Sequence, residues 1–386
     1  MSEDGGGRRG VRLTERQKIA WLRLIRSDNV GPATFRDLIN HCGSAERAIE
    51  LLPELSRRGG ARKDIRIANQ SEAEAELEAA HRFGSVFIGI GEPDYPSALK
   101  RIDGAPPLLA TIGNLEIASR PTVGIVGSRN ASVSGSKFTG RIVREIGRAG
   151  YSVVSGMARG IDAAVHHASL DTGTIAAMAG GLDCPYPPEN SDLYAEIRSG
   201  KGLAISEMPM GWEPRARDFP RRNRLIAGCA LGVIVVEAAY RSGSLITARR
   251  ANDFGRLVFA VPGSPLDPRA AGTNALIKDG AIMVTGAGDV LEALAPISRI
   301  EPDNEPLIEE PKDDDNFEWR PPEEDERAIV LAALGPAPVE IDDIIRHTQL
   351  PAQVIHFVLL ELDLAGRLHR HPGGMVSVET NQGELF

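Results

Sequence analysis

The first 80 residues show apolar side chains at helical spacing, beginning with LTERQKIAWLRLI at residue 13. Gly31-Pro32 breaks one helix and opens the next. Residues 13–80 are therefore predicted to form a helical domain of the SAM-like or helix-hairpin-helix class. A glycine-containing turn of that class can present backbone N–H groups to a DNA phosphate. Because the hydrophobic-Gly-x-Gly pattern is incomplete here, we favour a packing role.

From residue 121 onward, short apolar runs alternate with helical segments. Strands that are buried on both faces read as continuous apolar runs, so the alternation predicts a doubly wound parallel α/β sheet with helices on both faces. The stretch VIVVEA and the helix SLITARRANDFGRLVFAV are expected at the sheet edge, where their apolar residues would pair the domain with a second copy of itself. The predicted strands are TVGIVGS, YSVVSG, TIAAMAGG, LAISE, LGVIVVEA and LVFAVPG.

The C-terminal part, residues 323–380, has the pattern of three short helices followed by a hairpin at Pro372-Gly373-Gly374. This order predicts a winged helix, whose third helix would be the reader of a major groove. That helix, PAQVIHFVLLELDLAG, offers Gln353 and His356 but no Lys or Arg for phosphates. The pattern favours a protein-contact or packing module over a duplex reader.

The net charge of −9 is unevenly distributed along the chain. Residues 301–326 contain 13 Asp or Glu and 2 Lys or Arg, a balance of −11, so the rest carries −9 − (−11) = +2. Residues 298–322 are acidic and proline-rich, as is typical of a linker. Overall charge therefore does not exclude a nucleic-acid partner. No membrane span or signal segment is predicted, and three widely spaced cysteines fit a reduced, cytoplasmic protein.

Polar or glycine-rich turns follow the predicted strands, at the edge where ligands of open α/β sheets bind. Glycine lets a backbone approach a ligand closely, and helix N-termini present free N–H groups to anions. Five arginines lie close together in the stretch that precedes the fifth strand, and a polyanion bound between them would relieve their mutual repulsion. Some of these arginines could instead pair with acids such as Asp218 and Glu237. The five are Arg215, Arg217, Arg221, Arg222 and Arg224.

Signatures of common enzyme classes do not fit this chain. VGIVGSRNASVSGS lacks the G-x-G-x-x-G spacing of a dinucleotide fold, and no P-loop is present. His166 and His167 have no set of carboxylate partners that would indicate a metal, so a packed histidine is the better interpretation. No serine has an evident His–Asp relay. We predict no catalytic residue, no metal and no cofactor.

Long colinear motifs give the chain a resemblance to the DNA-processing protein A family (DprA or Smf). The match runs from about residue 85 to 290 and includes VGSR, SGMARGID, SEMPMG, FPRRNRLIAG, SGSLITA and GTNALIKDGA. The resemblance implies a Rossmann-like domain over residues 85–297 that binds single-stranded DNA and forms a homodimer. It also implies loading of RecA recombinase during natural transformation, with displacement of single-strand binding protein, and no catalytic activity.

Carried over by motif, the implied DNA-binding residues come from several strand ends. Phe219 could stack on a base and Asn223 could donate hydrogen bonds. The implied set is Ser128, Arg129, Gly156, Phe219, Arg221, Arg222, Asn223, Arg224, Ser242, Gly243, Ser244 and Thr247, with Asn274 and Lys278 nearby.

One enzyme alternative remains, a nucleotide-phosphate hydrolase of the cytokinin-activating type on a related Rossmann-like scaffold. It shares the phosphate-binding turns and would use Glu237, which follows a strand. Its P-G-G-x-G-T-x-x-E motif is absent, and the nearest string, SGSLITARRAND, lacks the paired glycines and the glutamate. The binding hypothesis is therefore preferred.

Overall fold

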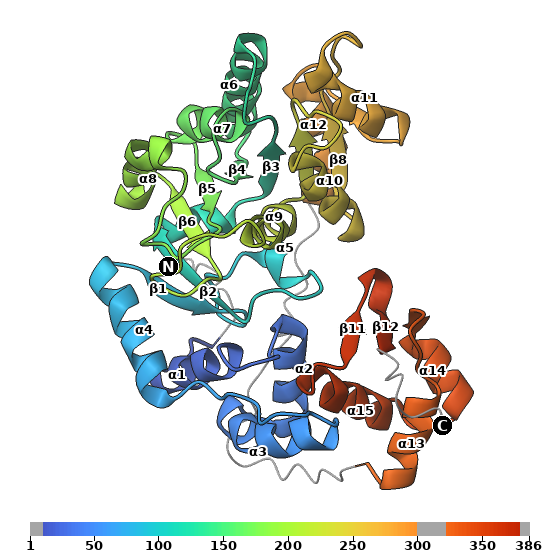
Figure 1. Cartoon of the computed structure of the whole chain (residues 1–386). Coiled ribbons are helices and arrows are strands. Elements are labelled where there is room, and N and C mark those ends of the chain that lie inside the picture. Colours follow the sequence, from blue (N-terminus) through green and yellow to red (C-terminus); the bar gives the residue numbers. More distant parts are fainter. Residues whose placement is uncertain (1–10, 299–321, 379–386) are drawn as a thin grey trace, which may run out of the picture. The chain divides into compact units, whose positions relative to one another are not determined.

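The computed structural model describes residues 11–298 and 322–378, which form two compact units. Unit 1 contains residues 76–298 together with 11–12, and unit 2 combines residues 13–75 with 322–378. The N-terminal and C-terminal parts of the chain therefore belong to one unit (Figure 1). Residues 299–321, which make up most of the predicted acidic linker, lie outside the described residues.

Unit 1 is built on a nine-stranded sheet in the order β1-β2-β6-β5-β4-β3-β7-β8-β9. From β6 to β9 neighbouring strands are parallel, and β1 and β2 extend one edge in antiparallel pairing. The predicted doubly wound sheet is thus confirmed, with an antiparallel edge added to it. The strands are β1 (Val86–Gly89), β2 (Leu108–Gly113), β3 (Thr122–Val126), β4 (Ser152–Ser155), β5 (Thr174–Ala177), β6 (Leu203–Ser206), β7 (Gly232–Val235), β8 (Leu257–Ala260) and β9 (Ile282–Met283).

Helices cover both faces of this sheet because the strands are apolar on both sides (Figure 1). On one face α6, α7 and α12 pack through residues such as Ile142, Val165 and Leu294 onto β3, β4, β7 and β8. On the other face lie α9 and α10. The helices of unit 1 include α5 (Ser97–Lys100), α6 (Val133–Arg148), α7 (Ile161–Ser169), α8 (Ser191–Glu196), α9 (Asp218–Cys229), α10 (Ser244–Asp253), α11 (Ala271–Lys278) and α12 (Ala287–Ser298).

Two expectations about the sheet edge are wrong. VIVVEA contains β7, which lies between β3 and β8 inside the sheet and is fully buried. SLITARRANDFGRLVFAV is not one helix, because α10 ends at Asp253 and Gly255, at φ 65°, turns the chain into β8. β7 and the end of β8 form part of the core because the parallel sheet buries them on both faces.

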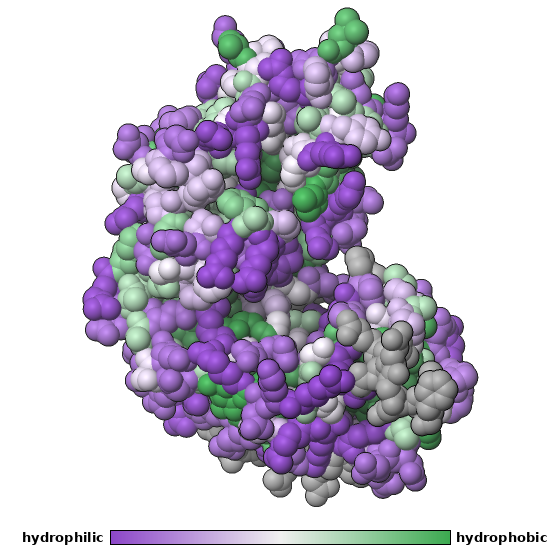
Figure 2. Space-filling view, in the orientation of Figure 1, coloured by the Kyte–Doolittle hydropathy of each residue, from purple (hydrophilic) through white to green (hydrophobic). Residues whose placement is uncertain are grey.

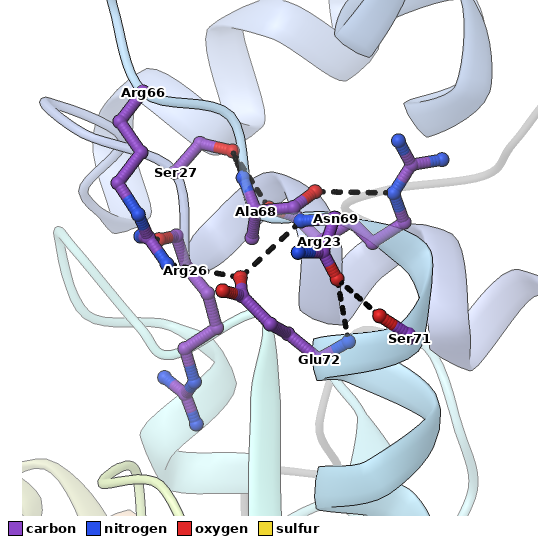
Figure 3. A network of polar contacts seen from close by, with 8 residues as sticks. All are labelled: Arg23, Arg26, Ser27, Arg66, Ala68, Asn69, Ser71 and Glu72. Carbon is purple, nitrogen blue, oxygen red and sulfur yellow. Dashed lines mark hydrogen bonds and ion pairs between the residues drawn. The ribbon is translucent and has the colours of Figure 1, made fainter.

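The N-terminal helical module, residues 13–75, contains the helices α1 (Glu15–Ile25), α2 (Pro32–Cys42) and α3 (Ala45–Arg58) and the start of α4 (Gln70–Phe83). A polar network fastens the segment before α4 to the end of α1 (Figure 3). The Ser27 hydroxyl donates to the Arg23 carbonyl at 2.8 Å and accepts from the Ala68 N–H at 3.1 Å. The Asn69 side chain accepts from the Glu72 N–H at 2.8 Å and so caps α4.

The winged helix, residues 322–378, contains α13 (Glu324–Ala332), α14 (Ile341–Thr348) and α15 (Ala352–Leu364). Its three-stranded sheet has the order β10-β12-β11, with β10 (Val339–Glu340), β11 (Leu368–Arg370) and β12 (Met375–Val378). The predicted three helices and hairpin are confirmed, and β10 is an additional strand. One face of α15, through Ile355, Val358, Leu359 and Leu362, fills the core of this domain.

The surface is mostly polar, as expected for units with closed cores. Hydrophilic residues cover most of the face shown in Figure 2, and hydrophobic residues appear there only in small patches. No described helix is both long and apolar enough to cross a bilayer.

Candidate nucleic-acid interface

A pocket of about 640 Å³ lies at the carboxyl ends of β3 and β7, where the strand order of the sheet reverses. This is the topological switch point at which open α/β sheets bind their ligands. Its walls are the loops after β3, β4 and β7 and one face of α9, and we call it the switch-point pocket. It is lined by Val126 to Asn130, Ala158, Asp162, Tyr186, Ala216, Phe219, Pro220, Arg222, Asn223, Ile226, Ala239, Arg241 to Ser244, Ile246 and Thr247.

Helix α9 supplies the pocket wall through side chains at helical spacing. Phe219, Arg222, Asn223 and Ile226 stand at positions i, i+3, i+4 and i+7, which share one face of a helix. Asp218 is the first residue of this helix, and its carboxylate accepts from the Arg215 N–H at 2.8 Å in the segment that leads into it. The sequence FPRRNRLIAG is therefore a helix with one face directed to the pocket and the other residues directed elsewhere.

Aromatic and cationic groups meet at the mouth of the pocket. Tyr186 and Phe219 form an edge-to-face pair with ring centroids 5.6 Å apart, and Tyr186 is 48% exposed. The guanidinium of exposed Arg129 lies 5.5 Å from the Phe219 ring centroid. Arg241 is a second exposed cation among the lining residues. Such a surface suits a base that stacks and a phosphate that pairs with a guanidinium.

Arg222 forms the floor of the pocket. It is 6% exposed, and its Nη1 donates to the carbonyls of Gly156 and of Ala177, the latter at 3.1 Å. Its Nε is buried and has no hydrogen-bond partner within the described part of the chain. Burial lowers the pKa of Arg222 to about 10, so the side chain remains a cation at pH 7.

The acid that faces this buried cation is Asp162, at the start of α7. Its carboxylate accepts from the backbone N–H groups of Gly156 at 3.2 Å and Ala158 at 3.4 Å. Burial raises the pKa of Asp162, and the Arg222 charge opposes that rise. Among the charged lining residues, Arg129, Arg222 and Arg241 against Asp162 give 3 − 1 = +2, a net positive pocket.

The start of α10 completes the pocket with donors. The hydroxyls of Ser242 and Ser244 lie 2.7 Å apart, and the Ser244 N–H points to the Ser242 hydroxyl at 3.3 Å. The Asn223 amide holds this turn by donating to the Gly243 carbonyl at 3.3 Å. The N–H groups of Leu245 and Ile246 are bonded to the carbonyls of Ser242 and Gly243, so the donors that this turn offers to an anion are its hydroxyls, at the positive end of the helix dipole.

Two glycines allow the strand-end loops to pack together beneath this site. A Cβ on Gly156 would lie 2.0 Å from Nη1 of Arg222, so only glycine leaves room for the guanidinium. Gly160, at φ 76°, adopts a left-handed conformation, and a Cβ there would lie 2.3 Å from the Ser128 carbonyl oxygen.

Nine of the fourteen sequence-predicted residues line the pocket: Ser128, Arg129, Phe219, Arg222, Asn223, Ser242, Gly243, Ser244 and Thr247. Gly156 lies behind Arg222 and is not itself lining. Asn274 is instead bonded to the Gly263 backbone, with its amide donating to the carbonyl at 2.9 Å. Lys278 is exposed at the end of α11 and does not line the pocket.

Arg221 and Arg224 lie on a different face of α9 from the pocket, one turn apart. Both pair with the buried Glu207 carboxylate, Arg221 Nε at 2.9 Å and Arg224 Nη2 still closer. Arg221 is 46% exposed in its side chain and Arg224 only 15%. Arg221 and Arg224 therefore do not line the pocket beside Arg222, because adjacent helical residues point to different sides. The acid pairing that the sequence left open for some of these arginines is found here, with Glu207 as the partner.

Sequence reasoning missed Tyr186, Arg241 and Asn130 as lining residues. Tyr186 opens the stretch YPPEN, which follows the glycine-rich turn after TIAAMAGG, and Arg241 directly precedes the Ser-Gly-Ser turn, so their positions beside these turns were the available signal.

Glu237 and His166, which were weighed as a catalytic and a metal-binding candidate, both make hydrogen bonds within unit 1. The Glu237 carboxylate accepts from the Ser132 N–H at 2.9 Å and from its hydroxyl, beside the first turn of α6. His166 is fully buried, with Nδ1 at 2.7 Å from the Thr174 hydroxyl oxygen. Burial lowers its pKa to about 3, which keeps the imidazole neutral at pH 7. Within residues 11–298 and 322–378, no group of His, Cys, Asp and Glu side chains is arranged to hold a metal ion.

Comparisons with known proteins cover nearly the whole chain. The family model of DNA recombination-mediator protein A matches residues 86–295, the DprA-like N-terminal HHH domain matches 15–79, and the DprA winged helix domain matches 318–374. The Protein Smf of Synechocystis is 33% identical over 393 residues, covering 94% of this chain and 98% of the relative. The DNA processing protein DprA of Streptococcus pneumoniae is 46% identical over 199 residues, covering 51% of this chain and 70% of the relative.

Solved structures agree with these matches. The crystal structure of DNA processing protein A from Streptococcus pneumoniae aligns with a TM-score of 0.59 at 35% identity, covering 73% of this chain and 98% of that one. The Helicobacter pylori protein, described by its single-stranded DNA binding mode, aligns with a TM-score of 0.50 at 26% identity, covering 55% and 96%. The chain therefore belongs to the DNA processing protein A family, whose members are also named DprA or Smf.

Proposed function

We propose that this protein binds single-stranded DNA in the switch-point pocket and loads RecA recombinase onto it in the cytoplasm during natural transformation. The observation that carries the binding proposal is the arrangement of Phe219 and Tyr186 below the exposed Arg129, beside the N-terminus of α10. These groups provide an aromatic face for a base and donors for a phosphate within one pocket. Family membership and the Helicobacter pylori structure support the same ligand.

Binding of this kind has little sequence preference. The lining residues present guanidinium, hydroxyl and aromatic groups, and the pocket has no helix that enters a base-pair groove. A single strand can bend its backbone into a pocket of this size and unstack a base, whereas a stiff duplex cannot do so without being deformed.

The further steps rest on the family's role as recombination mediators. We propose that the bound strand is passed to RecA with displacement of single-strand binding protein, and that two copies of unit 1 form a homodimer. Analytical ultracentrifugation at micromolar concentration tests the dimer: a monomer under these conditions contradicts it. Loading is measured as RecA-dependent strand exchange on DNA covered by single-strand binding protein, with and without this protein.

The binding proposal is tested by fluorescence anisotropy with labelled single-stranded and duplex oligonucleotides across a salt series. The affinity for single strands should fall with salt, with a log–log slope of about −0.7 for each phosphate neutralised. Arg129→Ala should weaken binding equally for all sequences and reduce the slope magnitude by about 0.7. Arg241→Ala should have the same effect.

Arg148→Ala is the matched control, because Arg148 is an exposed arginine at the last turn of α6, outside the pocket lining. An affinity that does not depend on salt, or an equal loss in Arg129→Ala and Arg148→Ala, would contradict the proposal.

The hydrolase alternative is tested separately by incubating the protein with nucleoside monophosphates and measuring free base. Because Glu237 is hydrogen-bonded to Ser132, we expect no release. Release that disappears in Glu237→Gln would replace the binding proposal with a catalytic one.

A further inference from the structure

The winged helix has a charge that is unsuited to a polyanion. Residues 322–378 contain 4 Arg, no Lys and 9 Asp or Glu, which gives 4 − 9 = −5. The N-terminal helical module, residues 13–75, contains 11 Lys or Arg and 9 Asp or Glu, which gives 11 − 9 = +2. The two parts of unit 2 therefore carry opposite net charges, as partners of one another would.

The four arginines of the winged helix are all engaged. Arg327 pairs with the buried Glu361 at 2.8 Å and Arg346 pairs with Asp343 at 2.8 Å, both within the domain. The other two reach the N-terminal helical module. Arg367 donates to the Gly59 carbonyl at 3.1 Å, and Arg370 joins Asp37 at 2.8 Å to its own domain's Asp363 at 2.9 Å. Cations that could otherwise contact a DNA backbone are used for contacts inside the chain.

Helix α15 is buried on two faces. The face formed by Ile355, Val358, Leu359 and Leu362 fills the core of the winged helix, as a third helix of this fold normally does. Phe357, Leu360 and Leu364 are also 3% exposed or less, although they are not part of that core. Phe357 packs against His41 of α2, with ring centroids 5.4 Å apart. The second apolar face of α15 thus has a partner, the N-terminal helical module.

The end of α15 is held by polar contacts at the hairpin turn of that module. The Leu364 carbonyl accepts from the Asn29 amide at 2.9 Å and from the Ser56 hydroxyl at 3.3 Å. Thr34, in the first turn of α2, donates to the Asp363 carboxylate at 2.9 Å. A carboxylate and the negative end of a helix are thereby placed at the positive end of α2, where the electrostatics are favourable.

The fit is close at one glycine. Gly59 has an ordinary helical φ of −69°, yet a Cβ at this position would lie 1.9 Å from the Glu361 carbonyl oxygen and 2.9 Å from the Ala365 Cβ. Glycine is needed here for contact with α15 and not for the backbone conformation of α3.

From these contacts we propose that the winged helix is an intramolecular docking module. Its third helix binds the hairpin turn and the α2–α3 face of the chain's own N-terminal helical module, so the docked surfaces are closed to nucleic acid. The exposed side chains of α15 are those of Ala352, Gln353 and His356, all near its start, and none of them is a Lys or Arg. The proposal concerns unit 2 and is independent of DNA binding in the switch-point pocket.

The test starts from the full chain with a specific protease site inserted between residues 303 and 318. After cleavage, the C-terminal fragment that contains residues 322–378 should remain bound to the rest of the chain in size-exclusion chromatography at micromolar concentration. Gly59→Ala adds a methyl group into the contact and should weaken retention about tenfold or more. Gly335→Ala is the matched control, because a Cβ there meets nothing within 4 Å, and retention should be unchanged.

Separation of the parent fragments, or equal retention in Gly59→Ala and Gly335→Ala, would overturn the proposal. Should Gly59→Ala fail to fold by circular dichroism, Asp37→Ala and Arg370→Ala, alone and combined, provide a double-mutant cycle. Non-additive losses of fragment affinity support docking, and additive losses contradict it. A loss of duplex affinity in Gln353→Ala with His356→Ala would show instead that α15 reads DNA.

Discussion

The switch-point pocket and α15 of the winged helix both stand where related folds contact nucleic acid, but they differ in charge and in exposure. The pocket is open, carries a net charge of +2 on its lining residues and exposes an aromatic pair. Helix α15 has no cation, lies in a domain with a charge of −5, and is buried on two faces. The difference shows that a fold often used for DNA binding does not itself provide a DNA site.

The largest effect is expected from replacing the buried cation at the floor of the pocket, Arg222. Replacing Arg222 with Met should destabilise the protein by about 2–4 kcal/mol, because the buried Gly156 and Ala177 carbonyls would lose their donor and Asp162 would lose a nearby buried positive charge. Urea unfolding followed by far-UV circular dichroism measures this loss. Adding Asp162→Asn should recover part of it, and a loss below about 1 kcal/mol would show that Arg222 does not support the floor of the pocket.

The aromatic surface should matter for single strands and not for duplexes. Phe219→Ala should weaken single-strand binding by about 1–3 kcal/mol, roughly 10-fold to 100-fold, through the loss of one stacked base. Anisotropy titrations at fixed salt provide the measurement. Tyr240→Ala is the control, since Tyr240 is 78% exposed but outside the pocket lining. Equal losses in the two variants would argue against stacking on Phe219.

Lowering the pH should reduce the free energy of unfolding of unit 1, which contains the pocket, because of His166. Its pKa is lowered from 6.5 to about 3 by burial, so below pH 6.5 the unfolded chain binds a proton that the folded chain does not. The contribution to stability is complete above pH 6.5 and is lost as the pH falls towards 3. Between pH 7 and pH 5.5 the loss should be about 1 kcal/mol.

Unfolding free energies of the parent and His166→Asn across this pH range isolate the histidine, because effects of other groups such as Asp162 are common to both. Identical pH dependence in the two proteins would show that His166 titrates normally.

The smallest change in DNA affinity is expected for substitutions on α15. Gln353→Ala and His356→Ala should change the affinity for single-stranded or duplex DNA by less than about twofold, because surface changes outside a binding site are close to neutral. The same anisotropy assay detects this. A larger loss would remove the contrast between the pocket and the winged helix.

The arginines of α9 show how far the linear sequence could lead. Their clustering identified the right helix and the right sheet edge, and Phe219, Arg222 and Asn223 do line the pocket. Arg221 and Arg224 instead pair with Glu207, 14 and 17 residues earlier in the chain. Placing FPRRNRLIAG on a helix would have assigned Arg221 and Arg224 to a different face from Arg222. Glu207 could not be identified as their partner from the sequence, because its position depends on where β6, which directly precedes it, lies in the sheet.

The sequence by itself determined the alternation of strands and helices, the order of the parallel strands' motifs and the winged-helix pattern, because these depend on local propensity and on which faces are apolar. The tertiary structure decided the order of the strands in the sheet and which arginines face the pocket. It also decided that α15 packs on α2 and α3, which lie more than 300 residues earlier in the chain. Such long-range pairs are set by complementary shape and charge between surfaces, which no local pattern records.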